Sequence, residues 1–137
     1  MSGVAAVLGV GPGLGAAVAR RFARGGYAVA LMARRRQSLE PVRGEIAGAG
    51  GAALAVPADA SDPGSVAAAF GRVREELGDP EVLVYNAGAF QPGGILEIPP
   101  ERFDECWRIN CAGAFYAARE VLPAMAEKGR GTVLLTG

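Results

Sequence analysis

The sequence predicts an α/β fold in which a parallel sheet of about five strands carries helices on both faces. Two observations lead to this prediction. Short apolar runs alternate along the chain with longer segments of helical periodicity, and a glycine-rich turn joins the first apolar run directly to a helix. Half of the 137 residues are hydrophobic, and 21 glycines and 9 prolines are too few for a disordered chain. We therefore expect one domain spanning residues 1–137.

Charge and composition exclude several classes of function. The 14 Lys and Arg residues equal the 14 Asp and Glu residues, so neither nucleic acid nor an anionic membrane is an expected partner. The absence of histidine excludes Ser-His-Asp catalysis and the commonest zinc sites, so no metal is predicted. No signal peptide or membrane span is apparent, and Cys106 and Cys111 are expected to be reduced thiols. The expected location is the cytoplasm.

The first strand and helix enclose the glycine-rich turn. The strand is predicted at residues 4–8 and the amphipathic helix at residues 16–24. In so glycine-rich a chain, the glycine spacing alone has roughly one chance in two of arising at random. Its position is more informative, because the helix lacks a capping side chain and its first N–H groups are free to bind phosphate. A nucleotide-binding turn is therefore favoured over an ordinary tight turn, with Gly9, Gly11, Gly13, Leu14 and Gly15 as the predicted cofactor-binding residues.

The alternation of strand and helix continues after this unit. A buried strand is predicted at residues 28–33, a helix at residues 37–47 and a third strand at residues 52–56. Ser61-Asp62-Pro63 then supplies a capping side chain and a first-turn proline for a helix that ends at about Leu77. Because crossovers between such strands are right-handed, the strands are expected to run parallel.

The second half of the chain adds two strands and two helical segments. A fourth strand is predicted at residues 82–85 and a fifth at residues 132–136. Helical segments at residues 101–109 and 112–128 are expected to meet near Asn110, because an asparagine amide competes with the helical backbone and favours a bend or bulge. The expected inner face of the second segment consists of Phe115, Ala118, Leu122 and Met125.

The glycine spacing resembles the short-chain dehydrogenase/reductase family, whose fingerprint is T-G-x-x-x-G-x-G. Leu8 stands in place of the threonine, and Pro12 occupies a position that is often a small polar residue. The resemblance implies a Rossmann-type doubly wound sheet, of which this chain would be the amino-terminal, cofactor-binding part. It also implies that the helix at residues 112–128 packs against another subunit, so a homo-oligomer is expected.

Two short segments extend the resemblance. Asp59-Ala60 matches the place of the family's acidic residue after the third strand, which contacts the adenine ring; an exposed loop aspartate is the alternative. Asn86-Ala87-Gly88 matches the end of the family's N-N-A-G motif, with Tyr85 replacing the first asparagine. In the family this motif braces the sheet beside the cofactor ribose, whereas an isolated tripeptide of this kind would be a turn.

Asn110 matches the asparagine between the family's fourth and fifth helices. There its main chain holds a water molecule in the proton relay, which would make Asn110 a catalytic position. A simple helix break or cap is the alternative.

The choice of dinucleotide is predicted from the end of the second strand, where the ribose 2′ position is read. Arg34 and Arg35 follow this strand, and no carboxylate occurs before Glu40. Arginine pairs with the 2′-phosphate of NADP, whereas an acidic residue would accept hydrogen bonds from the NAD diol. NADP is therefore favoured over NAD, and solvated surface arginines are the alternative.

The family's catalytic residues have no counterpart among these residues. They are a serine after the fifth strand and a Tyr-x-x-x-Lys motif that exchanges a proton with the substrate while hydride passes to or from the nicotinamide. The tyrosines at positions 27, 85 and 116 are followed four residues later by Leu31, Ala89 and Glu120. We therefore expect a cofactor-binding fragment of an NAD(P)-dependent oxidoreductase that acts on a carbonyl or secondary alcohol, and no turnover by this chain alone.

Two other function classes stay open at this point. A non-catalytic nucleotide-binding or interaction module would keep the cofactor fold without the active site. A methyltransferase on a similar sheet is weaker, because the matches at Asp59, Asn86 and Asn110 would then be coincidences.

Overall fold

The computed structural model describes residues 3–137 and contains every predicted strand and helix, with bounds that differ by at most two residues from those expected. The strands are β1 (Val4–Leu8), β2 (Ala28–Ala33), β3 (Ala53–Pro57), β4 (Pro80–Tyr85) and β5 (Thr132–Leu135). The helices are α1 (Leu14–Arg24), α2 (Arg36–Gly48), α3 (Pro63–Glu76), α4 (Pro100–Trp107) and α5 (Gly113–Lys128), and a π-helical turn, η1 (Arg108–Ala112), joins the last two.

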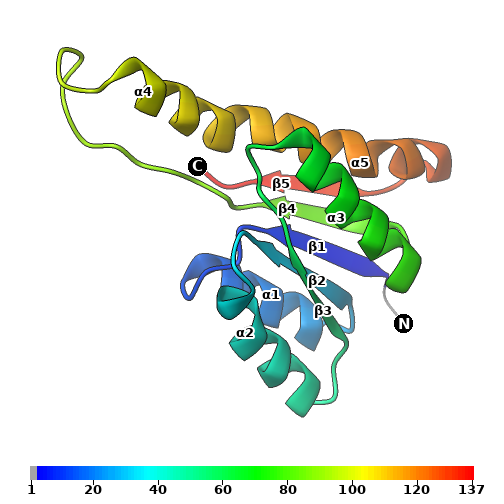
Figure 1. Cartoon of the computed structure of the whole chain (residues 1–137). Coiled ribbons are helices and arrows are strands. Elements are labelled where there is room, and N and C mark those ends of the chain that lie inside the picture. The colour runs from blue at the N-terminus through cyan, green and yellow to red at the C-terminus, as the bar shows by residue number, and fades with distance from the viewer. Residues whose placement is uncertain (1–2) are drawn as a thin grey trace.

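The five strands form one sheet in the order β3-β2-β1-β4-β5, and every pairing is parallel. From the central strand β1 the chain proceeds outward to β2 and β3, then crosses back through α3 to β4 on the other side of β1 (Figure 1). This reversal confirms the doubly wound α/β fold. Because the chain reverses direction here, the loops that follow β1 and β4 lead away to opposite sides and leave a crevice at the carboxyl ends of the two strands. Ligands of open α/β sheets bind in this crevice.

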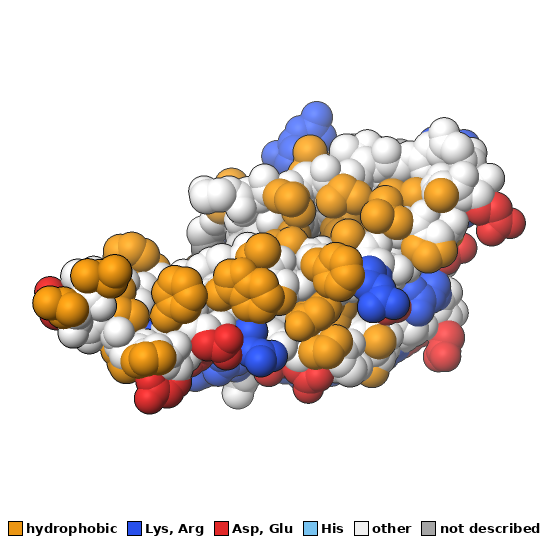
Figure 2. All heavy atoms as spheres, turned by 90° about the horizontal axis from the view of Figure 1, so that it is seen from above, with side chains coloured by type: hydrophobic (Ala, Val, Ile, Leu, Met, Phe, Trp, Pro, Cys, Tyr) orange, Lys and Arg blue, Asp and Glu red, His pale blue; other side chains and the backbone are white. Residues whose placement is uncertain are grey.

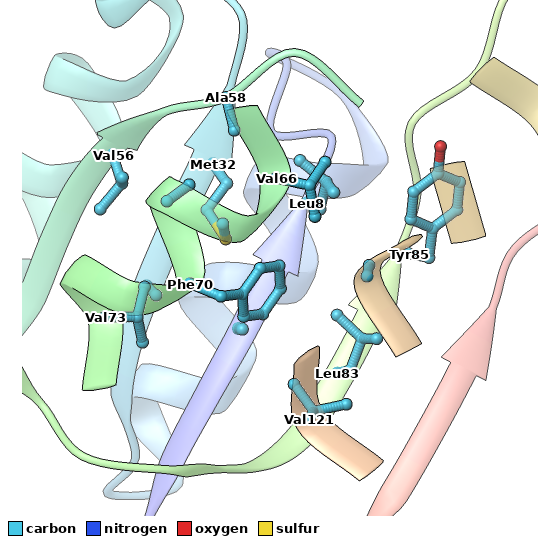
Figure 3. Packing of buried hydrophobic residues seen from close by; sticks show 14 of the residues in the cluster. Leu8, Met32, Val56, Ala58, Val66, Phe70, Val73, Leu83, Tyr85 and Val121 are labelled. Carbon is cyan, nitrogen blue, oxygen red and sulfur yellow. The ribbon is translucent and has the colours of Figure 1, made fainter. Parts of the chain in front are cut away.

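Both faces of the sheet are covered, so side chains alternate between two apolar cores. Ala5 and Val7 of β1 lie in the core beneath α1 and α2, whereas Ala6 and Leu8 lie in the core beneath α3 and α5. Figure 3 shows the core beneath α3 and α5, with the fully buried Phe70 of α3 at its centre. Such two-sided burial explains why the strands are nearly continuous apolar runs in the sequence.

The ends of two helices show different solutions to the same physical requirement. Asp62 caps α3 by accepting a hydrogen bond from the Gly64 N–H at 2.9 Å, as the Ser61-Asp62-Pro63 pattern predicts. Gly13 precedes α1 and offers no side chain to cap it. The first N–H groups of α1 therefore remain available to a ligand.

The expected inner face of α5 is wrong except at Met125, which is buried as expected. Its buried residues are Gly113, Ala117, Val121 and Met125, while Phe115 and Leu122 are 61% and 47% exposed. The expectation placed the bulkiest apolar side chains inside. Instead, the buried residues recur at a spacing of four, and the smallest of them, Gly113 and Ala117, let α5 approach β4 and α3 closely.

The displaced large side chains contribute to an apolar surface over α4 and α5. Figure 2 shows hydrophobic side chains gathered along this face of the molecule. The exposed large hydrophobic side chains of these two helices are Phe103 and Trp107 of α4 and Phe115 and Leu122 of α5. Within residues 3–137, no helix is long and apolar enough to cross a membrane.

Candidate dinucleotide site

The turn after β1 is fixed by close packing against the segment that follows β4. Gly9 has a φ of +110°, and a Cβ atom there would lie 2.5 Å from the Asn86 carbonyl carbon. A Cβ atom at Gly15 would lie 2.9 Å from the Cα of Val10, too close for an ordinary contact. Glycine is therefore required at positions 9 and 15 by the protein's own backbone.

The other two glycines of the turn have no such packing role. A Cβ atom at Gly11 or at Gly13 would meet nothing within 4 Å. Leu14 begins α1 and is 58% exposed, so the start of this helix faces open space. Exposed N–H groups at the positive end of a helix dipole suit a phosphate group.

A cavity of about 290 Å³ lies at the carboxyl ends of the strands and joins segments that are far apart in the sequence. Most of the predicted cofactor-binding residues line it, whereas Gly13, Leu14, Gly15, Arg35 and the predicted relay residue Asn110 lie outside its lining. The predicted residues in its wall are Gly9, Gly11, Arg34, Asp59, Ala60, Asn86, Ala87 and Gly88, together with Leu8, Val10, Ala33, Ala58 and Ile109.

Asn86 connects three strand ends within this wall. Its Nδ2 donates a hydrogen bond to the Gly9 carbonyl at 3.0 Å, and its Oδ1 accepts one from the Thr136 hydroxyl at 2.7 Å. The Asn86 backbone N–H also donates to the Leu8 carbonyl. The side chain therefore fixes the glycine turn relative to β4 and to the residue that follows β5.

Asp59 is held in a local turn beside the cavity. Its Oδ1 accepts hydrogen bonds from the Ser61 N–H at 3.0 Å and from the Ser61 hydroxyl at 2.7 Å, while its own N–H donates to the Ser65 hydroxyl. It is half-buried rather than fully exposed in a loop. These bonds fix the loop after β3 and leave Ala60 buried against the cavity.

Arg34 and Arg35 are exposed, and within residues 3–137 neither side chain forms a hydrogen bond or an ion pair. Arg36 differs, because it pairs with Glu40 at 3.4 Å. Glu40 also accepts a 2.7 Å hydrogen bond from Arg43, and these guanidinium groups lower the pKa of its carboxyl. The nearest carboxylate in the sequence is thus paired with other arginines, and the unpaired Arg34 lines the cavity, with Arg35 next to it in the sequence.

Asn110 lies in the π-helical turn η1, so the expected bulge near this residue is present. Its side chain makes two hydrogen bonds with Ala89, accepting from the N–H at 3.0 Å and donating to the carbonyl at 2.8 Å. Asn110 therefore fastens the helix to the loop that leaves the cavity. A break in the helix alone would not require this paired contact.

Three residues support the site in ways that the sequence does not predict. Thr136 and Ser65 hold Asn86 and Asp59 through their hydroxyl groups, and Tyr85 donates a hydrogen bond to the Ile109 carbonyl. Thr136 carried a usable signal, because it directly follows a strand and strand ends gather at the ligand edge. Ser65 and Tyr85 carried none, since the contact of Ser65 with Asp59 depends on the exact turn before α3 and the partner of Tyr85 depends on how the helices pack.

A second cavity, of about 250 Å³, lies between the last turns of α1 and α2. Helices in such folds run antiparallel to the strands, so this cavity is at the opposite edge of the sheet. Its charged side chains include Arg20 and Glu45, which pair with each other at 2.7 Å. Within residues 3–137, no group of acidic and cysteine side chains is arranged to hold a metal ion.

Known proteins similar to this chain match nearly all of it and are about twice as long. Residues 3–137 match the family described as short chain dehydrogenase. Versicolorin reductase stcU of Emericella nidulans is 35% identical over 134 residues, which cover 97% of this chain and 50% of the reductase. The 2,3-dihydro-2,3-dihydroxybenzoate dehydrogenase of Bacillus subtilis is 31% identical, with 98% of this chain and 51% of the relative covered. The chain thus spans about half the length of these relatives.

Solved structures give the same result. A metagenomic short-chain oxidoreductase in complex with NADP is 35% identical, with a TM-score of 0.93 over 97% of this chain and 61% of that one. An alcohol dehydrogenase of Thermococcus sibiricus complexed with 5-hydroxy-NADP is 33% identical, with a TM-score of 0.92 over 97% of this chain and 57% of that one. From its glycine turn to its fifth strand, the chain belongs to the short-chain dehydrogenase family.

Proposed function

We propose that these residues bind NADP(H) for an oxidoreductase that transfers hydride between the cofactor and a carbonyl or secondary alcohol. The observation that carries the proposal is the cavity at the switch point of the sheet. It gathers the glycine turn, the Asp59-Ala60 loop and the Asn86-Ala87-Gly88 segment into one wall. Dinucleotides bind doubly wound sheets at this edge.

Each part of the wall suits a different part of the cofactor. The uncapped start of α1 and the open space at Gly11 and Gly13 would accept the pyrophosphate. Asp59-Ala60 would contact the adenine, and Asn86-Ala87-Gly88 would lie beside the cofactor ribose. Two similar solved structures, one in complex with NADP and one complexed with 5-hydroxy-NADP, support a nicotinamide dinucleotide as the ligand.

The preference for NADP over NAD rests on Arg34 and Arg35. Their side chains are free, whereas Arg36 is engaged with Glu40. A 2′-phosphate would supply the anion that these two guanidinium groups lack. NAD has only a hydroxyl at this position and would leave them without a charged partner.

The bound nicotinamide supplies or accepts hydride, and the protein supplies position and proton transfer. Asn110 is the proposed relay position, because η1 places it next to the loop that leaves the cavity. The 137 residues contain neither Tyr-x-x-x-Lys nor a serine after β5. We therefore propose that this chain binds the cofactor without turnover and that the complete enzyme performs the reaction.

The proposal extends to assembly and location. The exposed apolar side chains over α4 and α5 support a homo-oligomer, because a patch of this kind is costly to leave in water. The free thiols of Cys106 and Cys111 support a reducing, cytoplasmic setting.

Cofactor binding is tested by titrating the purified chain with NADPH and following the fluorescence of the reduced nicotinamide. Circular dichroism first establishes that the sample is folded, and NADH serves as the comparison ligand. We expect saturable binding of NADPH, weaker binding of NADH and no oxidation of NADPH when a ketone is added. A folded sample without saturable binding of either dinucleotide would overturn the proposed cofactor site.

Oxidation of NADPH by a ketone would keep the cofactor site but contradict the proposed lack of turnover. Equal affinities for NADPH and NADH would contradict only the role given to Arg34 and Arg35.

A further inference from the structure

Tyr85 ends β4 with its side chain buried in the core beneath α3 and α5, where it is 2% exposed. Figure 3 shows its hydroxyl pointing away from Leu83 and Val121. The hydroxyl donates a hydrogen bond to the Ile109 carbonyl, which lies within η1. In a π-helical turn the backbone hydrogen bonds run from residue i to residue i+5, so their register is displaced relative to the helices on either side. The tyrosine side chain adds a donor from outside the helix at this turn.

The helix is shaped to accept this hydroxyl. Gly113 follows η1, and a Cβ atom there would collide with the Tyr85 hydroxyl and lie 2.7 Å from the Ala60 carbonyl oxygen. Burial raises the pKa of Tyr85 to about 12, so the hydroxyl keeps its proton at neutral pH. A protonated phenol is a donor to a carbonyl, whereas a phenolate could not donate.

The contact belongs to a closed set of hydrogen bonds around the cavity wall. Tyr85 holds Ile109, and the next residue, Asn110, holds Ala89 through two hydrogen bonds. Residues 85 and 89 therefore attach to adjacent positions of the same helical turn. Between them lie residues 86–88, which line the cavity, and Ile109 lines it as well.

We propose that Tyr85 is a positioning residue: its hydroxyl sets the conformation of η1 and, through Asn110, fixes the segment that forms the cofactor-side wall. The role toward the cofactor rests on the proposed function, whereas the effect on Asn110 and Ala89 does not. A tyrosine that only fills the core would need its ring but not its hydroxyl.

The test compares Tyr85→Phe with Tyr27→Phe in the full chain. Phenylalanine keeps the ring and removes the hydroxyl, and the hydroxyl of Tyr27 makes no hydrogen bond within residues 3–137. Amide hydrogen exchange is measured by NMR at Ala89 and at β1, where the amides report global unfolding. Tyr85→Phe is expected to speed exchange at Ala89 selectively and to weaken NADPH binding about two- to tenfold, the range of one neutral hydrogen bond. Tyr27→Phe is expected to change neither.

A double-mutant cycle with Asn110→Ala tests the route of the effect. If Tyr85 acts through Asn110, Tyr85→Phe should barely change exchange at Ala89 once Asn110 has been replaced. Additive effects, or unchanged exchange in the single variant, would overturn the proposal. So would faster exchange that is uniform across β1 and Ala89.

Two further outcomes are resolved by measurements on the wild-type chain. If it binds no NADPH, the proposed function fails, but the exchange measurement still decides the role of Tyr85. If Tyr85→Phe does not fold, exchange of the Tyr85 hydroxyl proton is followed in the wild type. Protection of that proton is expected, and rapid exchange would overturn the proposal.

Discussion

The four glycines of the turn after β1 divide into two pairs with different physical roles. At Gly9 and Gly15 a Cβ atom would collide with the protein's own backbone, whereas at Gly11 and Gly13 it would enter open space. The first pair lets the turn pack against the segment after β4. The second pair leaves room for something outside the protein. One residue type therefore serves both the fold and the ligand within seven positions.

Polar side chains around the cavity also fall into two groups, those that hold the protein together and those that are free for a ligand. Asn86 and Asp59 have their hydrogen bonds satisfied by protein groups and fix the wall. Arg34 and Arg35 are exposed and make no such bonds within the part of the chain described, residues 3–137. Replacing a residue of the first kind should cost stability, and replacing one of the second kind should cost ligand affinity.

The largest loss of stability is expected for Gly9→Ala. Alanine at a φ of +110° is strained, and its Cβ would collide with the backbone of residues 86–87. Together these effects should lower the free energy of unfolding by about 4 kcal/mol. Urea denaturation measures the change.

Gly44→Ala is the matched control, because Gly44 lies in α2 and a Cβ there would meet nothing within 4 Å. It should stabilise the chain by about 0.5–1 kcal/mol. Similar losses in the two variants would mean that the turn is not held as described.

The double variant Arg34→Ala/Arg35→Ala should have the largest effect on affinity. Loss of the charge-assisted bonds to a 2′-phosphate should weaken NADPH binding by about 2 kcal/mol, or about thirtyfold. NADH binding and the midpoint of urea denaturation should stay the same. Arg36→Ala is the control, because Arg36 already pairs with Glu40. An equal loss for NADH, or for Arg36→Ala, would contradict a 2′-phosphate site.

Gly11→Ala should reverse the pattern of Gly9→Ala. The new methyl group meets no protein atom, so the free energy of unfolding should change by less than about 1 kcal/mol. The methyl group enters the cavity and should weaken NADPH binding about tenfold. Isothermal titration calorimetry and denaturation on the same sample separate the two quantities. Unchanged affinity would show that the dinucleotide does not approach this glycine.

The sheet, its helices and the bulge at Asn110 could be predicted because each depends on local pattern. Apolar runs, the Asp62 cap and a mid-helix asparagine act over a few residues. The inner face of α5 could not be predicted in this way. Its choice of Ala117 over Phe115 depends on how closely the helix approaches β4 and α3.

In the candidate site, too, features set by local sequence could be predicted, whereas contacts that depend on tertiary packing could not. The wall residues were predictable because they follow strands, and parallel strands end at one edge. Their hydrogen-bond partners were not, because Thr136 lies 50 residues from Asn86 in the sequence and Tyr85 meets Ile109 across 24. Such contacts exist only after the sheet and helices have assembled.

The smallest effect is expected for Thr136→Val, which tests the hydroxyl that holds Asn86. Valine keeps the shape of the side chain and removes the 2.7 Å hydrogen bond to the Asn86 Oδ1. Because the site is exposed and water can replace the lost donor, the free energy of unfolding should fall by about 1 kcal/mol or less. Thr132→Val in β5 is the control, since it makes the same replacement but breaks no side-chain hydrogen bond within residues 3–137. If both variants have the same stability and the same NADPH affinity, the Thr136 hydroxyl does not help to hold Asn86.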